Sequence, residues 1–169
     1  MAEFNLENEM ITMSPEKLYA FGANLLSKNN YKSQCIGVSF IWMAANLDNS
    51  NAQLQLSYLY EAGEIIDKDA QEAAAWLTKA ADQGNAEAQL QVAFNYLIGK
   101  EGRKDKKLAF EWVRKAADQG NAEAQFAVGY SYMTGYWVEQ DDQKAAAWLK
   151  KAADQGHKEA LGQLSKINF

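Results

Sequence analysis

The chain has 169 residues, of which 48% are hydrophobic and 23% charged, and it carries a net charge of −5 with a pI of about 5.0. These values are ordinary for a folded globular protein. Nucleic-acid binders usually show a basic stripe, whereas the densest basic run here, Arg103-Lys104-Asp105-Lys106-Lys107, is short and interrupted by an acid. The composition therefore predicts no nucleic-acid partner.

The N-terminus, the hydropathy and the cysteine content predict a cytoplasmic protein. The first residues are acidic and lack the basic and apolar regions of a secretory signal. No apolar run approaches the roughly 20 residues that span a bilayer, so no membrane contact is expected. The single cysteine, Cys35, can form no internal disulfide and has no second cysteine as a metal-site partner. We expect neither a metal nor a cofactor.

The first elements in the chain are an expected N-terminal tail over residues 1–13 and a divergent helix pair over residues 14–46. The only proline, Pro15, follows Ser14 and suits the first position of a helix. Cys35 is expected to be a buried small apolar side chain of this pair, because a catalytic thiolate would need a base nearby.

Residues 47–156 repeat with a period of 36. Residues of one type recur at this interval as Tyr60, Tyr96 and Tyr132; Gly63, Gly99 and Gly135; Asp69, Asp105 and Asp141; Trp76, Trp112 and Trp148; and Gly84, Gly120 and Gly156. In the divergent pair, Asp48 stands where this last glycine would be. A period of this length is typical of solenoid arrays, and the three tryptophans are expected in the core.

Each repeat is predicted to form two helices. Asn85 or Asn121 would cap the first helix, and the recurring aspartate would cap the second. The glycines at 84, 120 and 156 would end the second helix in the left-handed conformation. The helix pairs are expected near 14–46, 51–82, 87–118 and 123–154, with a capping helix over residues 157–169. The predicted fold class is all-α, a right-handed superhelical solenoid of antiparallel helix pairs.

The third repeat resembles the Sel-one-like repeat (SLR) family, a close relative of tetratricopeptide repeats. The matching residues are Ala124, Val128, Gly129, Tyr132, Gly135, Val138, Asp141, Ala145, Trp148, Ala152, Ala153 and Gly156. The family's second loop glycine is replaced by Ile65, Glu101 and Trp137. The resemblance covers roughly residues 44–161 and implies scaffolding, adaptor or regulatory protein binding without a shared reaction. Some bacterial members look like immunity proteins that neutralise a toxin.

One face of the first helices is the predicted protein-binding surface. Their apolar side chains cover more than the single face that a surface helix needs, so a second face could line the concave side of the array, the usual recognition surface. The candidate residues are the aromatic side chains Tyr58, Phe94 and Tyr130; their apolar neighbours Leu54, Leu90 and Phe126; and the edge residues Asn51, Glu87 and Glu123. In the alternative interpretation, these side chains are buried between adjacent helices.

A loop contributes two further candidates. Trp137 breaks the tryptophan register and is flanked by Tyr136 and Val138, so it could be an exposed binding hot spot. Met133 lies near the same edge and could contribute. In the alternative interpretation, Trp137 folds back onto the terminal helix pair.

The sequence contains no recognisable catalytic set. The only histidine, His157, stands where asparagine caps the earlier repeats and is interpreted as a cap or a solvent-facing side chain. Hydrolase activity, suggested for cysteine-rich relatives, is disfavoured because no nucleophile–base pair is present. The leading prediction is a non-enzymatic adaptor, scaffold or inhibitor, monomeric when free, whose partner is a basic toxin or a signalling or secretion component. The alternatives are an immunity protein, because an acidic groove would steer a basic toxin, and a self-assembling structural repeat.

Overall fold

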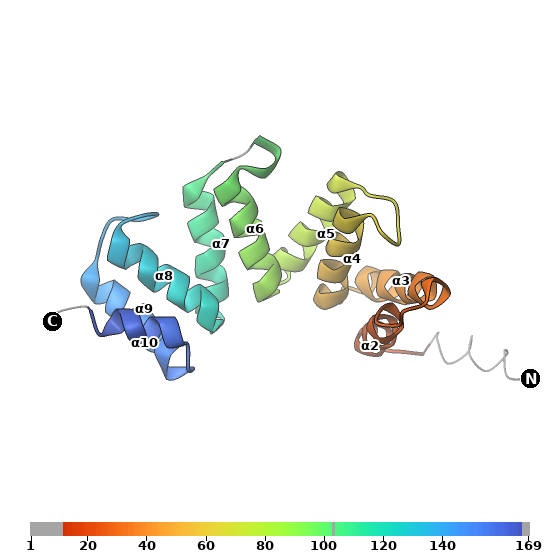
Figure 1. Ribbon diagram of the computed structural model, residues 1–169, viewed down its shortest axis with the longest axis horizontal. Helices are drawn as coiled ribbons and strands as arrows, with labels where there is room; N and C mark the ends of the chain where they lie inside the picture. Colours follow the sequence, from red (N-terminus) through yellow and green to blue (C-terminus); the bar gives the residue numbers. More distant parts are fainter. Residues whose placement is uncertain (1–11, 103, 167–169) are drawn as a thin grey trace, which may run out of the picture. The chain divides into compact units, whose positions relative to one another are not determined.

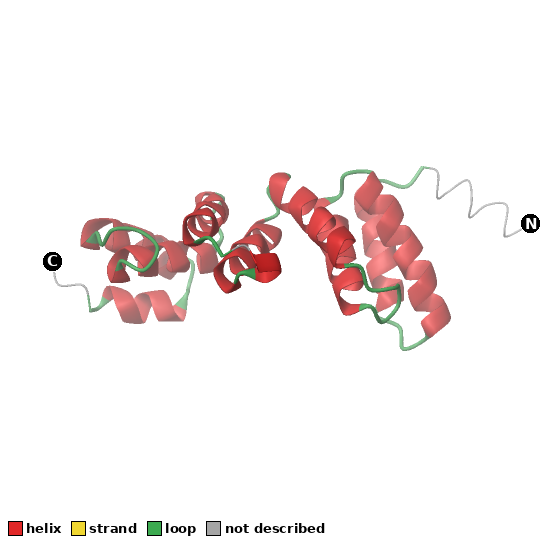
Figure 2. Cartoon of the chain, turned by 90° about the horizontal axis from the view of Figure 1, so that it is seen from above, coloured by secondary structure: helices red, strands yellow, loops and turns green. Residues whose placement is uncertain are grey.

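The computed structural model describes residues 12–102 and 104–166, and over these residues it consists of helices and loops without a strand (Figures 1 and 2). The helices are α2 (Pro15–Leu26), α3 (Tyr31–Asn46), α4 (Ser50–Ala62), α5 (Ala70–Asp82), α6 (Ala86–Ile98), η1 (Lys100–Gly102), α7 (Lys106–Asp118), α8 (Ala122–Thr134), α9 (Asp142–Asp154) and α10 (Lys158–Leu164). The predicted all-α class is confirmed, and the helix pairs lie within a few residues of the predicted bounds. The expected N-terminal tail lies almost wholly outside the described residues.

The chain divides into two compact units, residues 1–83 and residues 84–169. In the first unit α2 packs on α3, α3 on α4, and α4 on α5. In the second unit α6 packs on α7, α7 on α8, and α8 on α9, while α10 contacts both α8 and α9. None of the described helices has the length and apolar character that crossing a bilayer requires.

Side-chain caps begin the helices where the sequence predicts them. The Asn85 and Asn121 side chains accept hydrogen bonds from the backbone N–H groups of residues 88 and 124, at 3.0 and 2.9 Å. The aspartates at 69, 105 and 141 cap the second helices in the same way. At the last of them, the backbone N–H and the ammonium group of Lys144 both donate to the carboxylate and hold the pKa of Asp141 below its usual value.

The second helices end in a left-handed residue, as predicted. Gly84, Gly120 and Gly156 have φ angles of 89°, 92° and 87°. At the corresponding place after α3, Asp48 adopts φ 61°. A side chain is disfavoured in this region because its Cβ crowds the following carbonyl oxygen. The backbone after the divergent pair therefore follows the same path as in the repeats, although Asp48 is less suited than glycine to the left-handed conformation.

The tryptophans at equivalent positions differ in burial. Trp76 and Trp148 are 6% and 8% exposed, as expected for core residues. Trp112 is only half-buried, so the expectation that it lies in the core is wrong. It lies in α7, part of the first helix pair of its unit, where it packs on the core around Val113 and lies under the Lys115 ammonium, 3.6 Å from the ring centre.

Candidate protein-binding face

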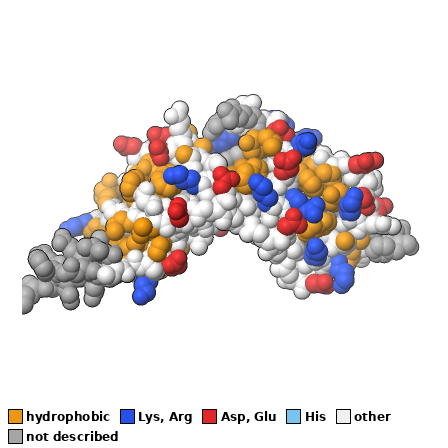
Figure 3. All heavy atoms as spheres, turned by 180° about the vertical axis from the view of Figure 1, so that it is seen from behind, with side chains coloured by type: hydrophobic (Ala, Val, Ile, Leu, Met, Phe, Trp, Pro, Cys, Tyr) orange, Lys and Arg blue, Asp and Glu red, His pale blue; other side chains and the backbone are white. Residues whose placement is uncertain are grey.

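Two exposed aromatic side chains of the second unit lie on the first helices of successive repeats. Phe94 on α6 is 53% exposed and Tyr130 on α8 is 43% exposed. Ile98, one turn beyond Phe94, is 56% exposed and was not anticipated from the sequence. The corresponding Tyr58 of the first unit is half-buried. On the face drawn in Figure 3, apolar side chains form separate patches interspersed with acidic and basic side chains.

The apolar residues four positions earlier anchor the first helices. Leu54 is 5% exposed, so it is not available to a partner, and the alternative interpretation of this residue is correct. Leu90 and Phe126 are half-buried. Leu90 packs against the core that contains Val128, and Phe126 against the small cluster around Leu149. These side chains therefore fix the helices that present the more exposed aromatics.

Tyr130 lies at the exposed end of a stack of three rings. Its ring centre is 5.8 Å from that of Phe126, and the Phe126 ring stacks on the imidazole of His157 at 4.6 Å with an interplanar angle of 20°. Offset aromatic contacts of this kind add roughly 0.5–1.5 kcal/mol beyond the burial of area. The stack connects α8 to the residue that begins α10.

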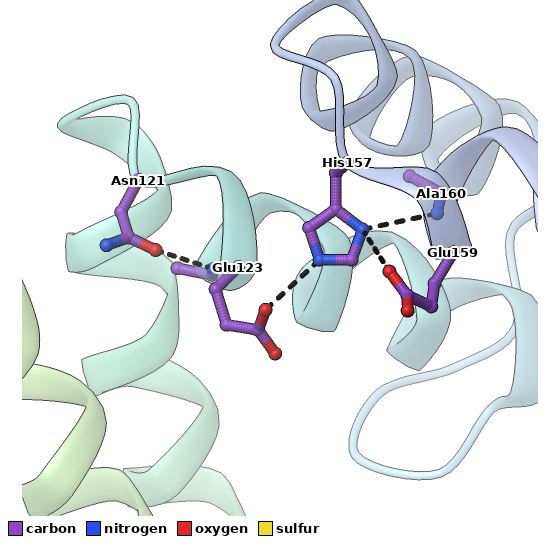
Figure 4. A network of polar contacts seen from close by, with 6 residues as sticks. Asn121, Glu123, His157, Glu159 and Ala160 are labelled. Carbon is purple, nitrogen blue, oxygen red and sulfur yellow. Dashed lines mark hydrogen bonds and ion pairs between the residues drawn. The ribbon is translucent and has the colours of Figure 1, made fainter.

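His157 caps α10, which confirms one of the two predicted interpretations. Its Nδ1 accepts a hydrogen bond from the backbone N–H of Ala160 at 3.3 Å (Figure 4). The proton of the neutral ring is then on Nε2, which donates to Glu123 Oε2 at 3.1 Å. Glu159 Oε2 lies 3.4 Å from Nδ1. The histidine side chain is 11% exposed, whereas both glutamate side chains are 70% exposed.

The edge residues Asn51, Glu87 and Glu123 are all exposed in the first turns of α4, α6 and α8. A carboxylate in the first turn of a helix is stabilised by the helix dipole, which is a sufficient structural reason for Glu87 and Glu123. Their exposure also leaves them accessible to a partner.

The loop between α8 and α9 does not expose Trp137. The indole is half-buried and packs on the core of the second unit, so it folds back onto the helices. Its ring centre lies 6.2 Å from that of Phe110, which belongs to α7 and not to the terminal helix pair of the alternative interpretation. Met133 is half-buried against the cluster around Leu149. The exposed aromatic of this loop is instead Tyr136, at 59%, whose ring lies 4.2 Å from the Lys106 ammonium.

Cys35 on α3 is half-buried, which makes it more exposed than predicted. Over the part of the chain that the structure describes, no group of three or more His, Cys, Asp or Glu side chains could hold a metal ion.

The family pattern that matches the chain and a similar solved structure are both those of Sel1 repeats. The Sel1 repeat pattern matches residues 50–85, 86–121 and 122–157, which together make up more than half of the chain. A Sel1 repeat protein from Oxalobacter formigenes is 33% identical with a TM-score of 0.71; the match covers 75% of this chain and 95% of that protein. No curated protein matches the sequence.

Two further solved structures are similar to the chain at lower levels. Cysteine rich protein B of Helicobacter pylori is 22% identical with a TM-score of 0.60 over 80% of this chain and 98% of that protein. A protective antigen of uropathogenic Escherichia coli with an SLR fold is 29% identical with a TM-score of 0.49, over 90% of this chain and 41% of its own length. The first of these supports the fold alone.

Proposed function

Because the chain belongs to the Sel1 repeat family, we propose that it is an adaptor, scaffold or inhibitor that binds a partner protein through the exposed face of its first helices. Sel1 repeats generally mediate protein–protein interaction and are typically non-catalytic scaffolds. The proposed contact residues centre on Phe94 and Tyr130 and are bordered by Glu87 and Glu123.

The observation that carries the proposal is the exposure of two large rings at equivalent repeat positions. Phe94 and Tyr130 are 53% and 43% exposed, although both helices bury other apolar side chains efficiently. Phe94 and Ile98 are both exposed, one turn apart on α6, and contiguous exposed apolar groups mark interaction sites. Aromatic side chains are also enriched among the residues that dominate binding energy. Their i−4 neighbours pack into the core, so the rings are held on ordered helices.

The proposal is tested by comparing two double variants of the whole chain. A partner is first enriched from lysate on the wild-type chain and purified. Its affinity is then measured by calorimetry for Phe94→Ser/Tyr130→Ser and for the control Tyr136→Ser/Leu108→Ser, whose exposed residues lie outside the first helices. We expect the first pair to cost about 2 kcal/mol or more per ring, as hot-spot aromatics do. An equal loss in the control, or none in the first pair, would reject this face.

An immunity function is the second candidate, and the net charge of −5 supports it. An acidic surface steers and complements a basic partner, and many nuclease toxins are basic. The test is co-expression with a growth-arresting product of a neighbouring gene. Rescue of growth by the wild-type chain, lost in Phe94→Ser/Tyr130→Ser at equal protein level, would support neutralisation by direct binding. If the double variant still rescues growth, neutralisation does not depend on Phe94 and Tyr130, and the toxin-binding site lies elsewhere on the chain.

A further inference from the structure

Among the α-helical residues of the matched repeats, the basic ones lie only on the second helix of each pair. The first helices, α4, α6 and α8, contain no lysine or arginine, and their charged residues are Glu61, Glu87 and Glu123. The second helices, α5, α7 and α9, carry eight basic residues, namely Lys79, Lys106, Lys107, Arg114, Lys115, Lys144, Lys150 and Lys151. They also carry acidic residues, and Arg114 and Lys150 pair with Asp118 and Asp154 on their own helices. Only the first helices are purely acidic.

The carboxylates of α6 and α8 share a helix face with the exposed rings. Glu87 precedes Phe94 by seven residues, and Glu123 precedes Tyr130 by the same interval. Seven residues are close to two turns, so the two side chains project in similar directions about 10 Å apart along the axis. Each helix therefore presents a carboxylate at one end of the face and an aromatic ring nearer the other.

The acidic series continues onto α10. Glu159 follows Glu123 by one repeat interval, and both carboxylates approach the His157 ring from different helices (Figure 4). Because Nδ1 of this ring accepts from Ala160, it offers no proton to Glu159 in the neutral state. Lys158 is the basic residue of α10. The two carboxylates, 70% exposed, can thus accept hydrogen bonds from a cation supplied by another molecule.

We propose that the occupant of this face is a basic amphipathic segment of the partner protein. Its apolar side chains contact Phe94, Ile98 and Tyr130, and a lysine or arginine about two turns away pairs with the carboxylates of Glu123 and Glu159. The inference rests on the proposed function, since it concerns the same face. An acidic segment is repelled there, because neither α6 nor α8 carries a cation to receive it.

The probes are three synthetic peptides with identical leucine spacing whose polar positions are all lysine, all glutamine or all glutamate. Binding to the full chain is measured by fluorescence anisotropy at low and high salt. We expect the lysine peptide to bind at least about tenfold more tightly than the glutamate peptide, with the difference shrinking as salt rises. The site is identified by Phe94→Ser/Tyr130→Ser, which should weaken the lysine peptide by about tenfold or more.

The charge requirement is isolated by matched neutralising variants. Glu123→Gln/Glu159→Gln keeps the acceptor oxygen opposite His157 and removes two charges from the face. Glu111→Gln/Glu139→Gln removes two exposed charges from α7 and from the loop between α8 and α9. We expect the first pair to weaken the lysine peptide about tenfold and to flatten its salt dependence, and the second to change it less than about twofold.

The possible failures are distinguishable. If the glutamine peptide binds as well as the lysine peptide and still requires Phe94 and Tyr130, the basic partner is wrong and the docking face stands. If the two glutamate pairs have equal effects, the attraction is due to net charge and the inference is overturned. If the lysine peptide binds independently of Phe94 and Tyr130, both the inference and the face it rests on are overturned.

Discussion

Gln125 and Gln155 are 30 residues apart and form a partly buried hydrogen bond, in which Gln155 Nε2 donates to Gln125 Oε1 at 2.8 Å. The same relationship joins Gln53 to Gln83 at 2.8 Å and Gln89 to Gln119 at 2.9 Å. Gln125 Nε2 also donates to the carbonyl oxygen of Ala117 at the end of α7, at 3.2 Å. One amide thus fixes α8 against the C-terminal ends of both α7 and α9.

Replacing this glutamine by a similarly shaped apolar residue is expected to destabilise the second unit. In Gln125→Met the volume is nearly kept, but the Gln125 side chain no longer bonds the carbonyl of Ala117 or the amide of Gln155, which retain their bonds to the backbone of Gly120. Each lost hydrogen bond contributes about 0.5–1.5 kcal/mol to stability, and urea titration followed by circular dichroism would resolve the loss of both. The control Gln143→Met is exposed on α9 and should stay within about 0.5 kcal/mol. Equal effects would mean that the glutamine bond contributes nothing specific.

Restoring the repeat glycine at position 48 is expected to stabilise the first unit. Asp48 has φ 61°, a conformation that glycine adopts without a steric penalty. Asp48→Gly should therefore raise the free energy of unfolding by up to about 1 kcal/mol. Asp67→Gly, in an exposed loop without positive φ, should instead lower it by a few tenths to 1 kcal/mol through unfolded-state entropy. Thermal melts of both variants give the sign directly.

The repeat pattern predicts the backbone of this chain better than it predicts side-chain exposure. Caps and glycines act through local hydrogen bonds and φ angles, so Asn85, Asp105 and Gly120 could be assigned from spacing alone. Exposure depends on what neighbouring helices contribute, and it differs between residues that the repeat makes equivalent. Leu54 is buried while Leu90 is half-buried, and Trp112 is less buried than Trp148. The stack of His157 on Phe126 combines residues from two helices and leaves no local sequence signal.

The unequal burial of the tryptophans should appear in the free energy of unfolding that is lost when each is replaced by alanine. Trp148 is 8% exposed and is flanked by Arg114 and Lys151, whose charged groups lie 4.7 and 4.0 Å from its ring centre. Trp148→Ala is expected to cost about 3–5 kcal/mol, the usual cost of emptying a large core site. Trp112→Ala should cost less, because the half-buried Trp112 ring buries less apolar area when the chain folds. Urea titrations that give the reverse order would contradict the burial described here.

The two roles of His157, as a cap and as a stacking ring, can be separated by two substitutions. His157→Asn keeps a capping side chain, as Asn85 and Asn121 show for α6 and α8, but removes the ring from Phe126. It should lower the free energy of unfolding by the stacking contribution, about 0.5–1.5 kcal/mol. His157→Ala loses the cap as well and should cost about 1 kcal/mol more.

The same pair of variants tests whether the stack supports the binding face. Phe126 lies between His157 and the exposed Tyr130, with ring centres 4.6 and 5.8 Å away. Removing the imidazole leaves one side of Phe126 without its packing partner, so the orientation of Tyr130 becomes less restricted. Partner affinity should then fall in both variants to a similar degree, because both lose the imidazole ring. Their free energies of unfolding should differ, because only the asparagine variant keeps the helix cap. If the asparagine variant instead binds like wild type although its ring is gone, the stack supports the fold and not the binding face.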